Sequence, residues 1–180
     1  MSITEQTTKT TAVPAGTWGL DPVHSSIGFA ITHNTVLTFR GTFAEYDAKL
    51  VDGRLEGSAK VASVVVDDEN LAGHLQTPDF FDAEQFPVLR FSSSAISREG
   101  EQLSLEGELT IKGVTAPVEL TGTISGPVTD AYGNERVGLD LETTINRHDF
   151  DVSWNAELPN GASILDDEVV ITADLALVQA

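Results

Sequence analysis

Apolar and polar residues alternate along most of the chain from Trp18 onward. The clearest stretch runs from Leu103 to Ile111, where apolar residues or glycine occupy the odd positions and polar residues the even ones. An alternation of period two is typical of β-strands that have one buried and one solvated face. The pattern predicts about eight strands, at residues 26–33, 36–50, 59–66, 89–96, 103–111, 118–124, 137–147 and 169–177.

Short turn sequences lie between these strands, among them Asp52-Gly53, Lys112-Gly113 and Asn160-Gly161. Such residues adopt the positive φ angles that tight reversals require, so we expect antiparallel hairpins. The absence of long helical patterns between the strands argues against βαβ units. An all-β antiparallel chain of this length must protect its edge strands, either as a sandwich of two sheets or as a closed barrel.

Residues 67–86 interrupt the alternation. A short helix capped by Asp67 or Asp68 is expected to begin there and to end before Pro78. Four of the eight phenylalanines lie in or just after this segment, namely Phe80, Phe81, Phe86 and Phe91. Because each ring carries on the order of 150–250 Å² of apolar surface, the rings should fold inward. We expect the insertion to pack on the strands as a lid or wall, with Phe91 in the next strand.

Composition places further limits on the protein. The 180 residues fit one domain, which we expect at residues 17–180, after a polar and disordered tail at residues 1–16. A net charge of −18 repels phosphate groups and argues against nucleic-acid binding, and the lack of cysteine excludes disulfides. Because we find no secretory leader and no run of about 18 apolar residues, we expect a cytoplasmic protein without a membrane span.

Histidine is the first candidate for site chemistry. His33 has the parity of Phe29 and Ile31, so its ring should point inward, either hydrogen-bonded in the core or in contact with a ligand. The four histidines do not show the i, i+2 or i, i+4 spacing of a metal site, and we expect no metal.

Arg147 is the second polar residue on a face predicted to be buried, because it has the parity of Leu141. A buried guanidinium is costly unless it is paired. One interpretation is that Arg147 ends its strand and pairs with a carboxylate such as Asp149 or Asp151. The other is that it holds an anionic or polar head group at the mouth of a pocket. The sequence contains no phosphate-binding loop and no nucleophile elbow, so we expect no catalytic residues.

Several segments carry a resemblance to a known family. They are Trp18-Gly19-Leu20-Asp21-Pro22-Val23-His24, Arg40-Gly41-Thr42-Phe43, His74-Leu75, Asp79-Phe80-Phe81-Asp82, Phe86-Pro87, Gly107-Glu108-Leu109-Thr110-Ile111-Lys112-Gly113 and Arg147-His148-Asp149-Phe150. In this order and spacing the chain resembles the YceI-like family of polyisoprenoid-binding, lipocalin-like proteins. Many members of that family carry an exported leader, which this sequence does not show.

The resemblance implies an extended, antiparallel, lipocalin-like β-barrel whose apolar interior accommodates a long isoprenoid chain, such as a quinone tail or a polyprenyl phosphate. The first hypothesis is therefore non-catalytic binding of an isoprenoid or other apolar small molecule, for storage or transport, without a cofactor. The residues predicted to contact the ligand are Phe29, Ile31, His33, Phe39, Phe81, Leu109, Leu141, Arg147 and Leu175.

Two alternatives remain open at this stage. The barrel could be the reaction chamber of an enzyme for a lipid-like substrate, which requires an inward polar pair such as His33 and Arg147 at the same end. The chain could instead be an interaction module with a filled core that forms a homodimer through a strand edge or the phenylalanine-rich segment.

Overall fold

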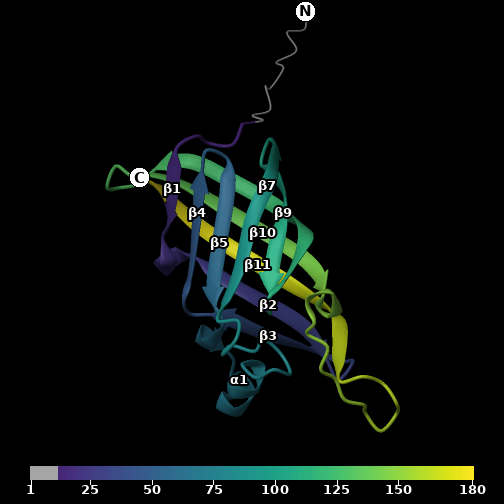
Figure 1. Cartoon of the computed structure of the whole chain (residues 1–180). Helices are drawn as coiled ribbons and strands as arrows, with labels where there is room; N and C mark the ends of the chain where they lie inside the picture. Colours follow the sequence, from purple (N-terminus) through teal and green to yellow (C-terminus); the bar gives the residue numbers. More distant parts are fainter. Residues whose placement is uncertain (1–11) are drawn as a thin grey trace, which may run out of the picture.

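The computed structural model describes residues 12–180, so residues 1–11 of the predicted tail lie outside the described part of the chain. Residues 12–180 form eleven strands, one α-helix and three 3₁₀ helices (Figure 1). The strands are β1 (Thr17–Leu20), β2 (Ser26–His33), β3 (Leu37–Phe43), β4 (Tyr46–Val51), β5 (Arg54–Lys60), β6 (Val64–Val65), β7 (Val88–Glu99), β8 (Gln102–Ile111), β9 (Val114–Thr129), β10 (Glu135–Asn146) and β11 (Leu165–Gln179). The helices are η1 (Pro22–His24), η2 (Val61–Ser63), α1 (Glu69–Leu75) and η3 (Arg147–Phe150).

The strands form a closed barrel with an additional arm. Pairing in the order β1-β4-β5-β7-β8-β9-β10-β11, and from β11 back to β1, closes an antiparallel ring of eight strands. The arm consists of β2, β3 and β6, which continue the sheet from β11. The predicted all-β, lipocalin-like barrel is therefore confirmed, and the sandwich alternative does not apply.

The long strand β11 belongs to both the barrel and the arm. Its last residues, Leu177 to Gln179, pair with β1, whereas the stretch from Leu165 to Asp174 pairs with β2 on the same edge. The barrel is thus closed by β1 at the end that carries the C-terminus and is extended by the arm at the end that carries α1 (Figure 1). We call these the β1 end and the α1 end.

One predicted strand, at residues 36–50, is wrong. β3 ends at Phe43 and β4 begins at Tyr46, and the two strands have different partners, because β3 pairs with β2 and β6 whereas β4 pairs with β1 and β5. The buried positions change from odd numbers, as at Phe43, to even numbers, as at Ala48 and Leu50. A strand cannot change parity without a bend, and the bend falls at residues 44–45.

The predicted strand at residues 59–66 is also misplaced. β5 begins earlier, at Arg54, and ends at Lys60, after which η2 leads into the two-residue strand β6. Two of the predicted hairpin turns, between β4 and β5 and between β8 and β9, are confirmed. Asp52 and Gly53 have φ angles of 47° and 79°, and Lys112 and Gly113 have φ angles of 52° and 74°. Such pairs of positive φ angles match the twist of the flanking strands.

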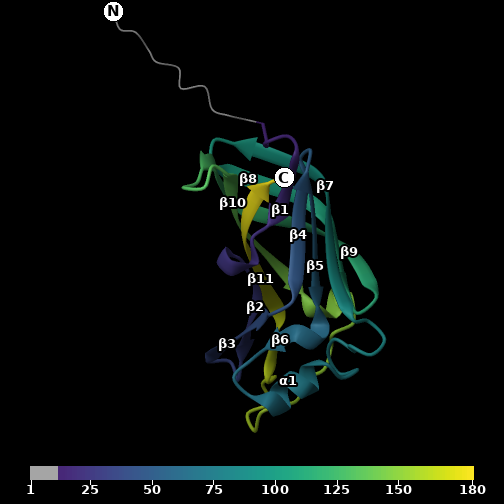
Figure 2. The ribbon, with the colours of Figure 1, turned by 90° about the vertical axis from the view of Figure 1, so that its left-hand side faces the viewer.

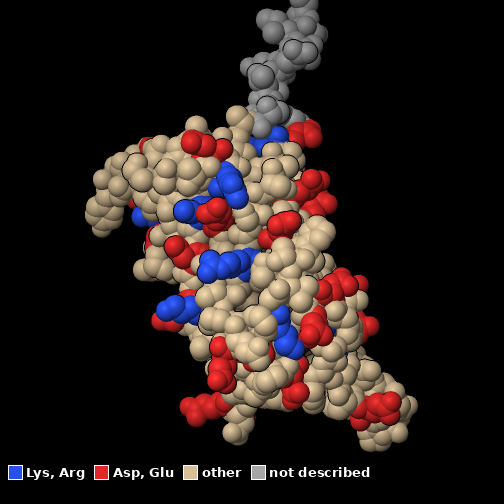
Figure 3. All heavy atoms as spheres, viewed as in Figure 1, with Lys and Arg blue, Asp and Glu red and all other residues tan. Residues whose placement is uncertain are grey.

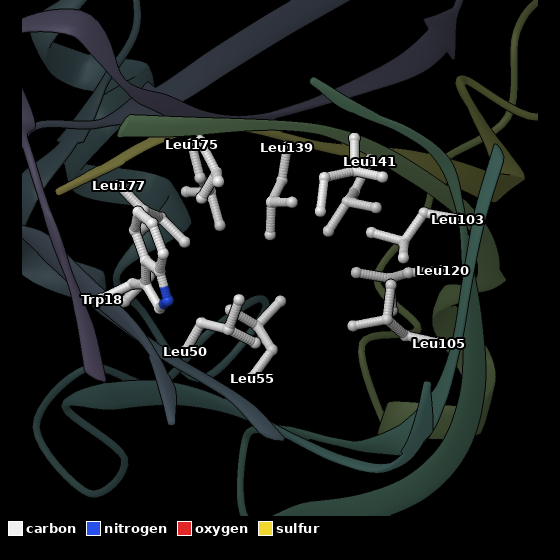
Figure 4. Packing of buried hydrophobic residues seen from close by; sticks show 13 residues of the cluster. Trp18, Leu50, Leu55, Leu103, Leu105, Leu120, Leu139, Leu141, Leu175 and Leu177 are labelled. Atoms are coloured by element: carbon white, nitrogen blue, oxygen red, sulfur yellow. The ribbon is translucent and has the colours of Figure 1, made fainter. Parts of the chain in front are cut away.

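The interior contains two apolar clusters. At the β1 end, leucines from around the barrel wall point inward, and Trp18 lies at one side of them next to Leu177 (Figure 4). The cluster comprises Trp18, Ala48, Leu50, Leu55, Leu103, Leu105, Leu120, Ile124, Val137, Leu139, Leu141, Leu175 and Leu177. The second cluster lies toward the α1 end and comprises Ile31, Phe43, Ala59, Val64, Leu75, Phe80, Ile111, Ile145, Phe150, Val152 and Leu165. The first cluster is rich in leucine, whereas the second contains most of the buried aromatic rings.

The insertion between β6 and β7 covers the α1 end (Figure 2). As predicted, α1 is short and is capped by Asp68, whose side chain accepts a hydrogen bond from the backbone N–H of Leu71. Lys112, in the β8–β9 turn, fixes the insertion to the barrel, since its Nζ donates to the carbonyl oxygens of Pro78 and Asp151. Among residues 12–180, no helix is long and apolar enough to cross a membrane.

Candidate functional site

A cavity of about 420 Å³ runs through the interior between the two clusters and reaches the α1 end. Alternate residues of single strands line it, for example Ile27, Phe29, Ile31 and His33 of β2. On β10 the lining positions are every second residue from Leu141 to Ile145, followed by Arg147 at the start of η3. Six residues of extended strand span about 20 Å, so the cavity is a channel that follows the strands.

The nine residues predicted to contact a ligand all line this channel. β2 supplies Phe29, Ile31 and His33, and Phe39 lies on β3. Phe81 comes from the insertion, Leu109 from β8, Leu141 from β10, Arg147 from η3 and Leu175 from β11. Parity along each strand decides which strand side chains face the interior, which is why the sequence indicated them. Phe81 was indicated instead by the apolar surface of the phenylalanine-rich insertion. Their contact with a ligand stays a prediction.

Aromatic rings form one wall of the channel. The ring of Phe29 lies 6.4 Å from that of Phe39, 5.9 Å from that of Phe43 and 6.3 Å from that of Phe81, measured between centroids. The rings are tilted or edge-to-face, the arrangements that aromatic pairs prefer. Gly41 makes room for this group, because a Cβ atom there would lie 2.4 Å from Cζ of Phe29.

A second aromatic group lies at the α1 end of the channel, and the sequence prediction missed part of it. The ring of His74, on α1, lies 5.0 Å from the ring of Phe80 and 5.2 Å from that of Trp154. All three residues line the channel. Phe80 was predicted to pack inward, and it does so with only 8% of its surface exposed. Trp154 belongs to the long connection between η3 and β11, where no alternation marks a buried face.

The insertion therefore lies over the end of the channel as the sequence predicts, although its phenylalanines have different contacts. Phe80 and Phe81 line the channel. Phe86 instead lies against the β8–β9 turn, where a Cβ atom on Gly113 would be 2.5 Å from its ring. Phe91 lies in β7, as predicted.

Arg147 is 3% exposed and holds the connection that follows it. Its Nη1 donates to the carbonyl oxygens of Val152 and Trp154, and its Nε donates to the carbonyl oxygen of Asp166, each at 2.8 Å. The first of the two interpretations of Arg147 is right in placing it at the end of its strand, since β10 ends at Asn146. Its pairing with a carboxylate such as Asp149 or Asp151 is wrong, because the guanidinium bonds backbone carbonyls instead. Burial lowers the pKa of Arg147, and the charges of Asp167 and Asp166 oppose this effect.

His33 lies at the same end of the channel as Arg147. His33 pairs through its backbone with Leu165, and Arg147 bonds to the carbonyl oxygen of the next residue, Asp166. His33 is half-buried and lines the channel. The contact of its ring with a ligand stays a prediction.

Besides His33 and Arg147, four polar residues line the channel, namely Ser58, His74, Arg90 and Thr143. His74 is engaged with Asp79, its Nε2 lying 3.0 Å from Oδ2 of that carboxylate. In the part of the chain that the structure describes, no three His, Cys, Asp or Glu side chains gather in a way that could hold a metal ion.

These observations define a class of protein, a closed antiparallel barrel that surrounds an apolar channel, as lipocalin-like proteins do. The chain belongs to the family of the YceI-like domain, whose sequence pattern matches residues 18–177. It is 31% identical to the protein YceI of Salmonella newport over 137 residues, which are 72% of each chain. It is 33% identical over 129 residues to a UPF0312 protein of Pseudomonas putida strain W619, covering 71% of this chain and 67% of that one.

Solved structures share the fold. The YceI protein of Campylobacter jejuni superimposes with a TM-score of 0.71 at 25% identity, over 83% of this chain and 90% of that one. A polyisoprenoid binding domain from Saccharophagus degradans, described as implicated in plant cell wall breakdown, gives a TM-score of 0.68 at 13% identity, over 91% and 98% of the two chains. The second likeness concerns the fold alone.

Proposed function

We propose that this protein binds one long apolar molecule, an isoprenoid chain or a chain of similar shape, inside the barrel without transforming it. The observation that carries the proposal is the channel of about 420 Å³ with its almost wholly apolar lining. Its volume falls within the range of about 300–1,000 Å³ that is usual for small-molecule sites. The Saccharophagus degradans domain, which has this fold and is named for binding polyisoprenoids, supports the same class of ligand.

A filled channel should abolish binding. Ala173 lines the channel on β11, and its replacement by tryptophan would place a large ring where the chain is proposed to lie. Ala30, on β2, provides the matched control, because it does not line the channel. We expect Ala173→Trp to lose most of its affinity for a fluorescent or radiolabelled prenyl alcohol, while Ala30→Trp retains the affinity of the wild type. Equal binding by both variants, with both folded by circular dichroism, would refute the proposal.

The enzyme alternative keeps one supporting observation, the position of His33 and Arg147 at the same end of the channel. Mass spectrometry of the bound molecule separates the two functions. A binding protein returns its ligand unchanged after prolonged incubation, whereas an isomerase or hydrolase returns a product of altered retention or mass. A filled interior would have favoured the interaction-module alternative, and the channel does not support it. Formation of a homodimer stays a prediction.

A further inference from the structure

Thr143 places a hydroxyl group in the apolar part of the channel. It lies on β10 between Leu141 and Ile145, which are both buried and line the channel. Thr143 lines the channel too and is only 9% exposed, whereas Glu142 and Thr144 are exposed on the outer face of the strand. Because side chains alternate between the two faces of a strand, the side chain of Thr143 points inward.

The hydroxyl of Thr143 has no hydrogen-bond partner among residues 12–180. In the same part of the chain, the one fully enclosed side-chain nitrogen or oxygen without a partner is Nη2 of Arg147. Oγ1 of Thr143 is unpaired but is not fully enclosed, so it borders open space, and the space that Thr143 lines is the channel. Since a hydroxyl both donates and accepts, a molecule inside the channel can bond to it in either way.

This hydroxyl lies well inside the channel, away from the α1 end. Thr143 precedes Arg147 by four residues, which is about 13 Å along an extended strand. Across the sheet Thr143 pairs with Ile171 on β11, and Ile171 pairs in turn with Phe29 on β2. Thr143 therefore lies at the level of the aromatic wall that surrounds Phe29.

The surroundings of Thr143 favour a neutral polar group over a charged one. The neighbouring side chains that line the channel on β10, β11 and β2 are apolar, namely Leu141, Ile145, Ile171 and Phe29. Transfer of an ion into such a site is strongly unfavourable unless an opposite charge accompanies it. A hydrocarbon segment at this level would exclude water and leave the hydroxyl unpaired, which is also unfavourable. A neutral oxygen avoids both costs.

We propose, on the basis of the proposed function, that the bound chain carries one neutral oxygen group within its apolar part and that this group hydrogen-bonds to Oγ1 of Thr143. A ketone, an ester and a hydroxyl share the required chemistry. Thr143 then selects among apolar chains by the position of this oxygen, and the groups at the ends of the chain play no part in the selection.

The depth of Thr143 determines the preferred position of the oxygen. An extended chain advances about 1.2 Å per main-chain bond, so about 13 Å corresponds to about ten bonds. For a chain whose end lies level with Arg147, the oxygen should therefore lie about ten bonds from that end. In a chain of 18 carbons this position is near the middle.

Three probes of equal chain length test the position of the oxygen. Octadecanoate has no oxygen within its chain, 10-oxo-octadecanoate has a carbonyl near the middle, and 4-oxo-octadecanoate has one near the carboxylate. Because the 10-oxo group is close to the middle from either end, the direction in which the chain enters does not matter. An oxo group also makes a probe more soluble in water, so each probe is compared with itself between protein variants. Affinities are measured for delipidated protein, below the concentration at which the probes aggregate.

Variants of Thr143 show whether its hydroxyl bonds the ligand. Thr143→Val replaces the hydroxyl by a methyl group of similar size, and we expect it to lower the affinity for 10-oxo-octadecanoate about five- to tenfold, the usual effect of one lost hydrogen bond. Its affinity for the other two probes should remain that of the wild type. Thr143→Ser keeps a hydroxyl and should keep the affinity for the 10-oxo probe.

Thr144→Val is the matched control, because Thr144 lies on the same strand but is exposed and does not line the channel. It should bind all three probes as the wild type does. Circular dichroism checks that each variant is folded.

The carbonyl stretch of the bound 10-oxo probe gives a readout that does not depend on affinity. A hydrogen bond to a carbonyl oxygen weakens the C=O bond and lowers its stretching frequency. Infrared difference spectra between carbon-13-labelled and unlabelled probe isolate the ketone band from the backbone amides. We expect a lower frequency in the wild type and in Thr143→Ser than in Thr143→Val.

The failure of this proposal and the failure of the proposed function give different results. If wild type and Thr143→Val bind 10-oxo-octadecanoate equally tightly and with the same carbonyl frequency, Thr143 does not select the ligand and the proposed function stands. A loss of affinity that is equal for all three probes reflects a general change in the channel and also overturns the selection by Thr143. If the wild type binds neither these probes nor a prenyl alcohol, both proposals are wrong.

Discussion

At the scale of single residues, two glycines determine where aromatic rings lie in the barrel. A Cβ atom on Gly41 would be 2.4 Å from Cζ of Phe29, and one on Gly107 would be 2.7 Å from Cε2 of Phe91. Neither glycine has a positive φ angle, so both are required for the space they leave and not for an unusual backbone conformation. Glycine weakens a strand because it has no side chain to pack. The rings of Phe29 and Phe91 fill the space next to Gly41 and Gly107 and supply this missing apolar contact.

Replacing Gly41 by alanine should disturb the channel. The added methyl group must displace the ring of Phe29, which lines the channel and contacts three other phenylalanine rings. We expect Gly41→Ala to lower the free energy of unfolding by about 1–3 kcal/mol, the usual cost of overpacking a core. Affinity for a prenyl chain should fall as well, because the displaced ring enters the space proposed for the ligand.

Gly138 supplies the control for this prediction. It lies within β10, where an added Cβ atom would meet nothing within 4 Å. Gly138→Ala should therefore leave stability unchanged or raise it slightly, because alanine loses less conformational entropy on folding. Denaturant unfolding and a binding titration measure both effects. If the Gly41→Ala protein is as stable as the Gly138→Ala protein and binds the prenyl chain with the same affinity, Gly41 is not required to make room for the ring of Phe29.

At the scale of elements, the alternation of apolar and polar residues predicted which side chains face the interior better than it predicted which strands pair with each other. Strand parity placed residues such as Phe29, Leu109 and Leu175 in the interior, because a side chain's face depends only on its position in its own strand. Pairing depends on residues far away in the sequence, so the bend between Phe43 and Tyr46 and the separate arm were not foreseen. The parity change across that bend was visible in the sequence and would have revealed it.

The surroundings of Arg147 were predicted less well for a related reason. Its partners lie in the connection between η3 and β11, at Val152 and Trp154, and in the first residues of β11. That connection has neither alternation nor a helical pattern, so nothing local indicates which of its backbone carbonyls turn toward the barrel. The sequence could predict a buried cation, but it could not predict that carbonyls would hold it and leave Nη2 free.

The insertion makes a prediction about ligand release. Phe81 belongs to the insertion that covers the α1 end, lines the channel and contacts Phe29 and Phe43, so a ligand that leaves beneath the insertion is expected to pass its ring. Phe81→Ala should increase the dissociation rate of a bound prenyl chain several-fold. It should also lower the free energy of unfolding by up to about 3 kcal/mol, the low end for phenylalanine truncation, because Phe81 is only half-buried.

A variant at Phe86 shows whether faster ligand release by Phe81→Ala comes from the loss of a gate or only from a general loss of stability. It lies in the same insertion but packs on Gly113 and does not line the channel. Phe86→Ala should destabilise the protein without increasing the dissociation rate to the same extent. Stopped-flow displacement by excess unlabelled ligand measures the rates. If the two variants release ligand equally fast, the insertion is a structural plug and Phe81 is not a gate.

At the scale of the whole molecule, acidity determines how stability responds to pH. The chain has 28 acidic and 10 basic residues, and Figure 3 shows acidic side chains spread over the face in view. At neutral pH this excess destabilises the compact state through self-repulsion. Asp174 adds to the effect, because it pairs across β10 and β11 with Asp140, and burial together with this neighbour raises the pKa of Asp174. Stability from such a group is present at low pH and is lost as the pH rises through its folded pKa.

Asp21 acts in the opposite direction. Hydrogen bonds with His24 and Arg136 lower its pKa to about 2, and Arg136 also bonds Asp130, whose pKa is lowered in turn. Stability from these carboxylates is present above their ordinary pKa of about 3.9 and is lost as the pH falls through the folded values. The two effects together predict that the unfolding temperature rises as the pH falls from 7 toward 4 and decreases at lower pH.

Two variants test which carboxylates cause the rise in unfolding temperature between pH 7 and 4 and the decrease below pH 4. Asp174→Asn should raise the unfolding temperature at pH 7 and reduce the rise between pH 7 and 4, because it removes the repulsion from Asp140. Arg136→Met should lower the unfolding temperature above pH 4 and flatten the decrease below it, because Asp21 and Asp130 then lose their shared partner. Calorimetry at constant ionic strength measures both. A wild-type maximum at or above pH 7, or an Asp174→Asn curve parallel to that of the wild type, would show that the carboxylate pair does not control stability.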